Sequence, residues 1–272
     1  MEEITVIKPK KRIRSLDFQE ILRYRELFLT FAWRDIRVRY KQTIIGGAWA
    51  IVQPLLTMVV FSFFFGKIAQ IPSDGVPYPI FSYSGLLLWI FFSNSISNAS
   101  TSLVGNRALV SKVYFPRAII PISSTIVMFL DYLIASIVML LLMVYYRIPF
   151  TFSLLLVPLL LLMTWVLANG IGLLLAAINV KYRDVRFALP FFIQLLIFIT
   201  PVIYPVSVSG KYRWVIALNP MSGLIEAHRA ALLGHQAINY PLLIPSVIFT
   251  ILIFIIGALY FKNVERFFAD II

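Results

Sequence analysis

Long apolar blocks alternate with short polar stretches along most of this chain. Six blocks are long enough for a helix that crosses a hydrocarbon core, which takes about 17–25 residues. They occupy residues 44–65, 80–103, 119–145, 153–178, 188–204 and 242–260. Proline-containing turns, such as IPSDGVPYP at 71–79, separate several of them. The pattern predicts an all-α integral membrane protein with six transmembrane helices.

The segment before the first block, residues 17–33, has helical spacing instead of a continuous apolar run. Its larger apolar residues fall on one side of the predicted helix: Phe18, Ile21, Leu22, Leu29 and Trp33. An amphipathic helix joined to a transmembrane span is expected to lie in the membrane interface. We therefore divide the chain into a tail with an amphipathic interface helix, residues 1–43, and a transmembrane domain, residues 44–272.

The segment between the fifth and sixth blocks, residues 205–240, contains its own helix signals. Asn219 suits an N-cap, Pro220 the first helical position and Gly234 the stop. The helix between them has about fourteen residues, too few to span a membrane. We predict a short re-entrant helical hairpin that dips into the outer leaflet, either as an outward gate or as a lid over the fifth and sixth spans. The gate candidates are Trp214, Asn219, Pro220, Glu226, His228 and Arg229. Glu226 and Arg229 are three residues apart and are expected to pair locally.

The composition agrees with a membrane protein, because 60% of the 272 residues are hydrophobic and 13% are charged. Soluble domains average about 45–50% apolar and about 25% charged residues. The net charge of +12 is unevenly distributed: nineteen Lys and Arg residues lie on the side of both termini and five on the other. The positive-inside rule therefore places both termini in the cytoplasm. The basic charge is mainly a topology signal, so we expect no nucleic-acid partner.

The sequence lacks the motifs of several kinds of enzyme. It has no cysteine, which excludes disulfides, thiolate metal sites and cysteine nucleophiles. It contains no phosphate loop of the form G-x-x-x-x-G-K-S/T, no H-E-x-x-H and no G-x-S-x-G. We therefore predict no catalytic residue, no metal and no cofactor for this chain.

Asp131 is the one ionisable acid or base inside the predicted spans. Ion-coupled transporters usually carry several embedded ionisable groups, so a single acid gives little support for an ion-coupled flippase. Asp131 is either a relay or substrate contact, or an acid that is hydrogen-bonded between helices. We favour the second interpretation, because an acid without a visible partner costs less to bury when it is neutral.

Polar and aromatic positions within the spans are candidates for lining a hydrated path. Asn94, Asn98 and Thr101 recur at helical spacing and form one polar stripe on the second span. The candidates for the channel lining are Trp49, Gln53, Phe64, Asn94, Asn98, Gln194 and Phe198. Amides can hydrogen-bond sugar hydroxyls, and aromatic faces can stack on sugar rings. The alternative is that the amides bridge helices and the aromatic residues face lipid.

Four segments, arranged in order around the six predicted spans, carry a resemblance to a known family. They are RDIRVRYKQTIIGGAWAIVQP at 34–54, NRALVSKVYFPRAIIP at 106–121, NVKYRDV at 179–185 and LNPMSGLIEAHRAALLG at 218–234. On these segments the chain resembles, over nearly its whole length, the ABC-2 family of transport permeases. It is most similar to the polysaccharide-export branch, which contains the membrane subunits of O-antigen and teichoic-acid exporters.

The resemblance implies a homodimer that works with two copies of a separate ATP-binding cassette subunit, on which ATP and Mg would be bound. It implies export of lipid-linked polysaccharide such as O-antigen, usually on undecaprenyl diphosphate, through a channel at the dimer interface. The membrane would be the bacterial inner (plasma) membrane. A drug or another lipid is the alternative cargo, and a membrane-embedded glycosyl or acyl transferase is the alternative class of protein.

By the same match, the interface helix and the segment 106–117 would contact the ATPase. The predicted coupling residues are Arg107, Lys112, Tyr114 and Arg117, together with Arg183 and Asp184, which could equally cap helix ends. The residues before the first span would form an entrance for the lipid diphosphate, because Arg pairs bidentately with phosphate. These entrance candidates are Arg34, Arg37, Arg39, Tyr40 and Lys41. The alternative is that the cations bind anionic membrane lipid, each contributing about 1 kcal/mol.

Overall fold

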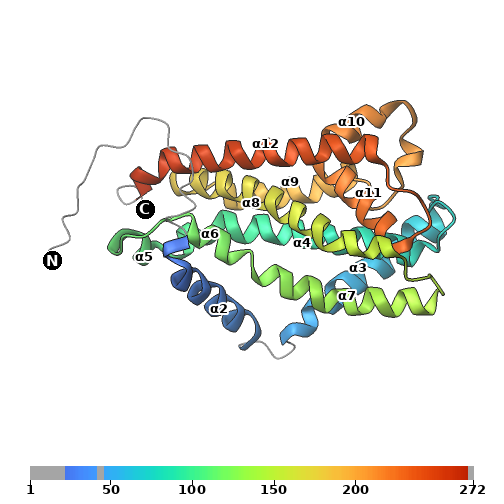
Figure 1. Ribbon diagram of the computed structural model, residues 1–272, viewed down its shortest axis with the longest axis horizontal. Helices are drawn as coiled ribbons and strands as arrows, with labels where there is room; N and C mark the ends of the chain where they lie inside the picture. The colour runs from blue at the N-terminus through green and yellow to red at the C-terminus, as the bar shows by residue number, and fades with distance from the viewer. Residues whose placement is uncertain (1–21, 42–45, 269–272) are drawn as a thin grey trace.

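The computed structural model describes residues 22–41 and 46–268, and this part of the chain is helical, without β-strands (Figure 1). Five of its helical segments are long and apolar enough to cross a membrane. They are Gly46–Ile68, Tyr78–Gly105, Ile119–Tyr145, Phe152–Lys181 and Tyr240–Phe267. These segments correspond to the first four predicted spans and the sixth. The prediction of an all-α, multi-pass membrane protein is therefore confirmed.

Most of these segments consist of more than one helix. The first three contain η1 (Gly46–Ala48), α3 (Trp49–Phe61) and η2 (Ser62–Ile68), then α4 (Tyr78–Gly105), then α6 (Ile119–Ser124) and α7 (Val127–Tyr145). The last two contain η3 (Phe152–Leu156) and α8 (Val157–Lys181), then α12 (Tyr240–Val264) and η5 (Glu265–Phe267). A short helix, α5 (Arg107–Lys112), follows α4 at one end of the bundle, which we call the α5 end.

The fifth predicted span, residues 188–204, forms a shorter helix than expected. α9 covers Val185–Ile199, which is 15 residues, whereas a spanning helix needs about 20. The chain leaves the helix at Thr200, whose backbone is extended, directly before Pro201. The count of six spans is therefore not confirmed, and a membrane crossing by α9 and the turn after it stays a prediction.

The predicted interface helix is present and continues further along the chain than expected. α2 covers Arg25–Lys41, so the basic residues after Trp33 are helical as well. Residues 17–21, at the start of the predicted helix, lie outside the described residues. So do residues 42–45, where the first span was predicted to begin.

The two sides of α2 have different surroundings. Leu22, Leu29 and Trp33, from the predicted apolar side, are exposed, whereas Phe31 and Ala32 are buried. The buried side packs on α6 at the α5 end of the bundle. The apolar side therefore points away from the protein, as expected for a helix between protein and lipid, although its position in a membrane interface stays a prediction.

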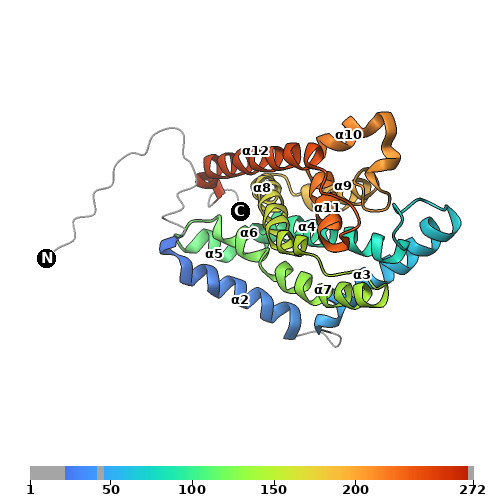
Figure 2. The same cartoon turned by 45° about the vertical axis from the view of Figure 1, so that its right-hand side comes forward.

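The segment after α9 forms two helices at the opposite end of the bundle, which we call the α10 end. They are α10 (Arg213–Leu218) and α11 (Pro220–Leu233). The Asn219 side chain accepts a hydrogen bond from the backbone N–H of Met221 over 3.1 Å, and Gly234 ends α11 with φ = 61°. The predicted caps and the predicted length of α11 are therefore confirmed. In Figure 2, α11 lies between α12 and α4, on both of which it packs; its insertion into a membrane leaflet stays a prediction.

Helices α4, α8, α11 and α12 pack closely at small residues, and we call these four helices the scaffold. A Cβ atom added to Gly257 of α12 would lie 2.0 Å from the carbonyl oxygen of Gly170 in α8. One added to Gly172 of α8 would lie 2.6 Å from Cβ of Ala99 in α4. Small residues at helix crossings allow backbones to approach closely in membranes. The scaffold therefore fixes the position of α4, against which the polar site is built.

Helices α3 and α9 are far less covered than the scaffold. In the apolar 18-residue stretch of Tyr78–Gly105, 78% of the residues are buried, against 11% in the corresponding stretch of Gly46–Ile68. Along α9, Val185–Ile199, no residue is buried. The apolar side chains of α3 and α9 are therefore open to lipid or to another protein chain.

Candidate functional site

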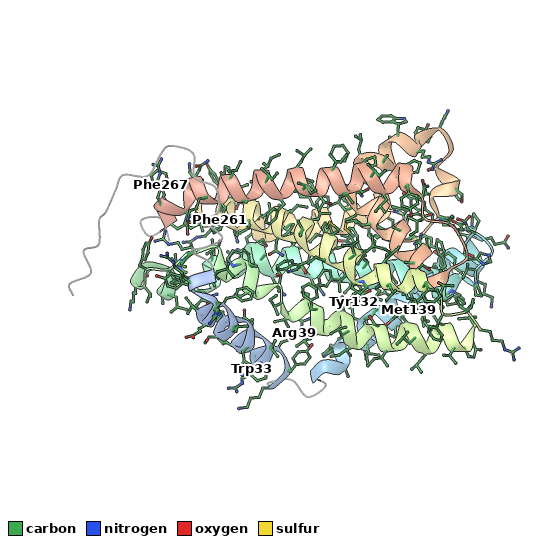
Figure 3. The ribbon with its side chains drawn as sticks, in the orientation of Figure 1. Trp33, Arg39, Tyr132, Met139, Phe261 and Phe267 are labelled. Atoms are coloured by element: carbon green, nitrogen blue, oxygen red, sulfur yellow. The ribbon has the colours of Figure 1, made fainter. Side chains whose placement is uncertain are left out.

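The site is built around an ion pair between α2 and α7. Arg39 Nη2 lies 2.5 Å from Oδ2 of Asp131, and the Tyr40 hydroxyl donates a hydrogen bond to Oδ1 of the same carboxylate over 2.5 Å. Figure 3 shows Arg39 where α2 approaches α7. Asp131 is thus hydrogen-bonded between helices, as we favoured. Its partners, however, come from the interface helix, and the absence of a visible partner in the sequence was misleading.

Burial differs between the two members of this ion pair. The Asp131 side chain is 12% exposed and the Arg39 side chain is 40% exposed. A carboxylate at such a position is costly without a cation and hydrogen-bond donors around it. Consecutive residues of α2 supply both, since Arg39 binds one oxygen and Tyr40 the other. The arginine remains partly open, so it can contact a ligand without leaving the carboxylate.

One hollow lies directly beside this pair, between α3, α4 and α7, and we call it the Gln53 hollow. Its empty volume is about 430 Å³. Its wall residues are Arg39, Trp49, Ala50, Gln53, Pro54, Leu87, Ile90, Phe91, Asn94, Met128, Asp131, Tyr132 and Ala135. Three predicted channel residues, Trp49, Gln53 and Asn94, are thus brought together with the predicted entrance residue Arg39.

A second hollow lies nearer the α5 end, between α2, α4 and the start of α7, and we call it the Arg34 hollow. Its empty volume is about 720 Å³. Its wall residues are Arg34, Asp35, Val38, Arg39, Asn98, Ser102, Asn106, Ser124 and Val127. Arg34 donates hydrogen bonds to Asp35 Oδ1 over 2.7 Å and to Asn106 Oδ1 over 2.9 Å. Arg39 lines both hollows, so they are adjacent along α4, and we call the two hollows together the polar tract.

The polar wall of this tract follows a four-residue spacing along α4 and the residue directly after it, Asn106. Asn94 lines the first hollow, and Asn98, Ser102 and Asn106 line the second. Residues four apart share one side of a helix. The sequence analysis placed Thr101 in the stripe, but Thr101 is exposed and lines neither hollow. Extending the four-residue spacing from Asn94 would have found Ser102 and Asn106.

Several predicted site residues lie outside the tract. Phe64 on η2 is exposed, and so are Gln194 and Phe198 on α9. Arg37 is exposed with its guanidinium 5.1 Å from the ring centre of Trp33, and Lys41 is exposed at the end of α2. The proposed roles of these residues in a channel or an entrance stay predictions.

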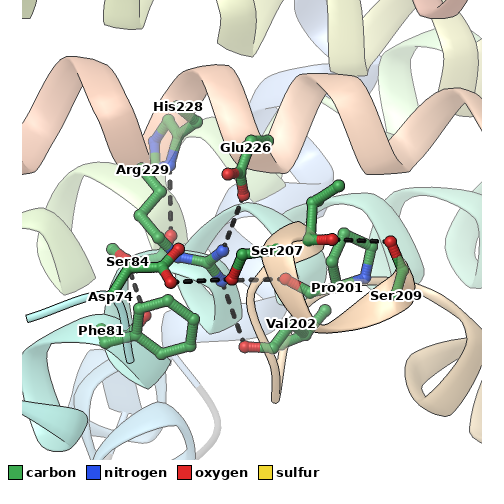
Figure 4. A network of polar contacts seen from close by, with 11 residues as sticks. Asp74, Phe81, Ser84, Pro201, Val202, Ser207, Ser209, Glu226, His228 and Arg229 are labelled. Atoms are coloured by element: carbon green, nitrogen blue, oxygen red, sulfur yellow. Dashed lines mark hydrogen bonds and ion pairs between the residues drawn. The ribbon is translucent and has the colours of Figure 1, made fainter. Parts of the chain in front are cut away.

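A second arginine–carboxylate pair is enclosed at the α10 end of the bundle (Figure 4). Arg229 donates to Glu226 Oε2 over 3.0 Å, and also to the carbonyl oxygens of Pro201 and Val202 over 2.9 and 3.2 Å. Its guanidinium lies 3.9 Å from the ring centre of Phe81. The predicted local pair is confirmed. Arg229 in addition ties the turn after α9 to α4 and α11.

Three more hydrogen bonds hold α11 and the loops of this end in place. His228 is fully buried, and its Nδ1 donates to the Ser84 carbonyl oxygen over 3.1 Å while its Nε2 accepts from the Tyr132 hydroxyl over 2.7 Å. Ser207 donates to Oδ1 of Asp74 over 2.8 Å.

Helix α11, which carries Glu226, lies outside the five segments that are long and apolar enough to cross a membrane. Burial raises the pKa of the Glu226 carboxyl in this helix, and the adjacent Arg229 opposes that shift.

The six gate candidates occupy different surroundings. Trp214 is exposed on α10, whereas His228 and Arg229 are buried inside the bundle. Asn219 caps α11 and also donates through Nδ2 to Thr200 Oγ1 over 2.8 Å. Pro220 is the first residue of α11. A gating movement by these residues stays a prediction.

The predicted coupling residues lie at the α5 end. Arg107, Lys112 and Tyr114 are exposed, as are Arg183 and Asp184 in the turn before α9. The Asp184 side chain makes no capping hydrogen bond to α9, so the alternative role as a helix cap is not observed for it.

Arg117 forms two hydrogen bonds with Glu265, at the end of α12. Its backbone N–H donates to Glu265 Oε1 over 2.7 Å, and its guanidinium donates to the Glu265 carbonyl oxygen. Arg117 thus ties the loop after α5 to the end of α12. Among residues 22–41 and 46–268, no group of three or more His, Cys, Asp or Glu side chains is arranged for a metal ion.

Comparison with known proteins agrees with this architecture. The sequence model of a family described as ABC-2 type transporter matches residues 26–233, a range that contains both hollows and the enclosed pair. The chain therefore belongs to the ABC-2 type transporter family.

Individual relatives cover nearly the whole chain. The O-antigen export system permease protein RfbA of Myxococcus xanthus is 28% identical over 92% of this chain and 96% of its own length. The protein of the same name from Klebsiella pneumoniae is 28% identical over 91% and 95%. The polysialic acid transport protein KpsM of Escherichia coli is 27% identical over 86% and 91%.

Proposed function

We propose that this chain is the permease subunit of an ATP-driven exporter that moves lipid-linked polysaccharide across the bacterial inner membrane. The observation that carries the proposal is the polar tract, which runs from the Arg34 hollow to the Gln53 hollow within an ABC-2 fold. Relatives named for O-antigen export and polysialic acid transport support polysaccharide as the cargo class. Both termini are then cytoplasmic.

The Arg34 hollow suits the diphosphate of a lipid carrier. Arg34 and Arg39 contribute guanidinium groups to its wall, and Asn98, Ser102 and Asn106 contribute neutral polar groups. A guanidinium can form two parallel hydrogen bonds with a phosphate. Both arginines already contact carboxylates, which orients them and limits the net positive charge of the hollow.

A separate ATP-binding cassette subunit would dock at the α5 end and bind the ATP and Mg. Exposed Arg107, Lys112 and Tyr114 are suited to this contact, with Tyr114 82% exposed. Tyrosine and arginine are enriched among the residues that dominate binding energy at protein interfaces. Two such subunits would serve two copies of the permease.

The weakly covered helices α3 and α9 support a homodimer with a channel between the copies. Phe64 and Phe198 are 52% and 55% exposed, on the same two segments that the single chain leaves open. A second copy would cover part of these surfaces and place aromatic residues along the path of the glycan. α10 and α11 would then lie at the outer end, where Trp214 is available to gate the exit.

The test is ATP-driven transport in proteoliposomes that contain this chain with its ATP-binding subunit. Replacing Arg34, Arg37 and Arg39 together by Gln should lower export of lipid-linked polysaccharide by roughly tenfold or more, since each lost charge-assisted hydrogen bond contributes about 1.5–3 kcal/mol. Arg25→Gln is the matched control, because Arg25 is an exposed cation on the same helix that lines neither hollow.

The outcomes separate the roles of these cations. Unchanged export by the triple variant, with normal membrane insertion, would show that the cations only bind anionic lipid. An equal loss of export in the triple variant and in Arg25→Gln would likewise show that the cations only bind anionic lipid. Transport of drugs or unglycosylated lipids without transport of lipid-linked polysaccharide would contradict the proposed cargo.

A further inference from the structure

The Gln53 hollow contains two side-chain amides that the fold does not use. Gln53 on α3 and Asn94 on α4 face the same space. Within residues 22–41 and 46–268, neither amide makes a hydrogen bond to another residue. Lipid offers no hydrogen-bond partners to such groups, so unpaired amides in a membrane-embedded wall indicate a polar occupant.

The neighbouring side chains narrow the chemistry of that occupant. Trp49 is 52% exposed and lines the hollow beside the amides, so its indole offers a flat apolar face. The charges in the wall are Arg39 and Asp131, which are paired with each other. The hollow therefore favours a neutral group with several hydroxyls and an apolar ring face over an ion.

Arg39 connects this hollow to the Arg34 hollow, where the diphosphate would bind. Its guanidinium is part of both walls, and its attachment to Asp131 holds it at the boundary between them. A diphosphate that contacts Arg34 and Arg39 would carry its glycosidic oxygen to the same boundary. The group attached there is a sugar ring, which has the neutral, hydroxyl-rich chemistry that the Gln53 hollow accommodates.

We infer that the Gln53 hollow is a subsite for the lipid-proximal sugar, the one joined directly to the diphosphate. The assignment rests on the proposed function and deepens it. Gln53 and Asn94 hydrogen-bond the hydroxyls of this sugar, and Trp49 packs on its ring. The Arg39–Asp131 pair separates the sugar subsite from the phosphate subsite. The permease thereby distinguishes a glycosylated lipid diphosphate from a bare one within a single protomer, before the rest of the glycan passes.

The test compares two probes bound to the assembled exporter in nanodiscs. One probe is undecaprenyl diphosphate, and the other is undecaprenyl diphosphate that carries one N-acetylglucosamine residue. Wild-type protein should bind the glycosylated probe more tightly than the bare one. Gln53→Leu and Asn94→Leu should each lower this preference by several-fold and together by roughly tenfold, the size expected when neutral hydrogen bonds are lost. Affinity for the bare probe should stay the same, which also reports that the variants are folded.

Gln236→Leu is the matched control, because Gln236 is an exposed amide at the α10 end and should leave both affinities unchanged. A sugar preference that survives in the double variant would overturn the assignment, and so would equal weakening of both probes. Wild-type protein that binds both probes equally would overturn the subsite alone. Wild-type protein that binds neither probe would overturn the proposed function as well.

Discussion

Two arginine–carboxylate pairs lie toward opposite ends of the bundle, and they differ in what surrounds them. Arg229 and Glu226 are 7% and 11% exposed at the α10 end, and Arg229 is also held by two backbone carbonyls and the face of Phe81. Arg39 is 40% exposed and borders two hollows. Protein groups enclose the first arginine, whereas the second is more exposed and borders the two hollows.

This difference separates a structural role from a functional one. A buried charge that loses its partner is strongly destabilising, so the Arg229 cluster should control folding. The Arg39–Asp131 pair has one member that is 40% exposed, so it should contribute less to stability than the enclosed pair, because exposed ion pairs contribute only about 0–1 kcal/mol. The cost of holding Asp131 inside the bundle is therefore explained better by a role for Arg39 in binding than by a gain in stability. Variants that break the Arg229–Glu226 pair should thus lower stability, whereas variants that break the Arg39–Asp131 pair should lower export.

The largest expected effect is the loss of folding in Arg229→Ala. The substitution leaves Glu226 and the carbonyl groups of Pro201 and Val202 buried without their donor, which should cost about 3–5 kcal/mol of stability. Thermal unfolding in detergent, followed by loss of the monodisperse peak, measures this change. Arg213→Ala, at an exposed position of the same end, is the control. Equal stability of the two variants would contradict a structural role for Arg229.

A smaller effect is expected from Gly85→Ala on α4. A Cβ atom there would lie 2.8 Å from Arg229 Nη2 and 3.2 Å from the Val202 carbonyl oxygen, so the enclosed arginine has to shift. Overpacking of this kind costs about 1–3 kcal/mol.

The same helix offers a matched control for this substitution. Gly105→Ala places its Cβ in open space and should stabilise α4 slightly, by at most about 1 kcal/mol. The comparison is made by thermal unfolding of the two variants. Equal melting temperatures would show that the space around Arg229 is not tightly filled.

The smallest effect is expected from Tyr40→Phe at the half-exposed pair. The variant loses one hydrogen bond to Asp131, worth about 0.5–1.5 kcal/mol, and leaves the ion pair with Arg39 in place. Export should fall several-fold while the melting temperature changes little. Tyr145→Phe, at the exposed far end of α7, should leave export unchanged. A large loss of stability in Tyr40→Phe would show that the Arg39–Asp131 pair has a structural role, as the Arg229–Glu226 pair does.

The sequence predicted the features that depend on neighbouring residues. The caps of α11 at Asn219 and Gly234 are local signals, because each acts through the first or last turn of its own helix. The local pair of Glu226 and Arg229 follows from their separation of three residues on one helix. The apolar blocks likewise need little tertiary information, since five of the six form segments long and apolar enough to cross a membrane.

Features that join distant segments could not be predicted in this way. Arg39 and Asp131 belong to different helices, and no periodicity connects them. The unpaired amides of Gln53 and Asn94 were recognised as polar, but their common hollow depends on how α3 packs on α4. The early end of α9 had a usable signal, because Pro201 disfavours a helical conformation in the residue before it. We extended the predicted span past Pro201 because the next residues, 202–204, are also apolar.

The most direct test of this account is the charge-swapped double variant Arg39→Asp with Asp131→Arg, measured for both stability and export. The swap keeps an ion pair between α2 and α7 but moves the cation from the boundary of the two hollows to α7. The account predicts a melting temperature near that of the wild type, together with export of lipid-linked polysaccharide as low as in Arg39→Gln alone. Recovery of export along with stability would show that the pair acts only as a structural link, and would contradict a binding role for Arg39.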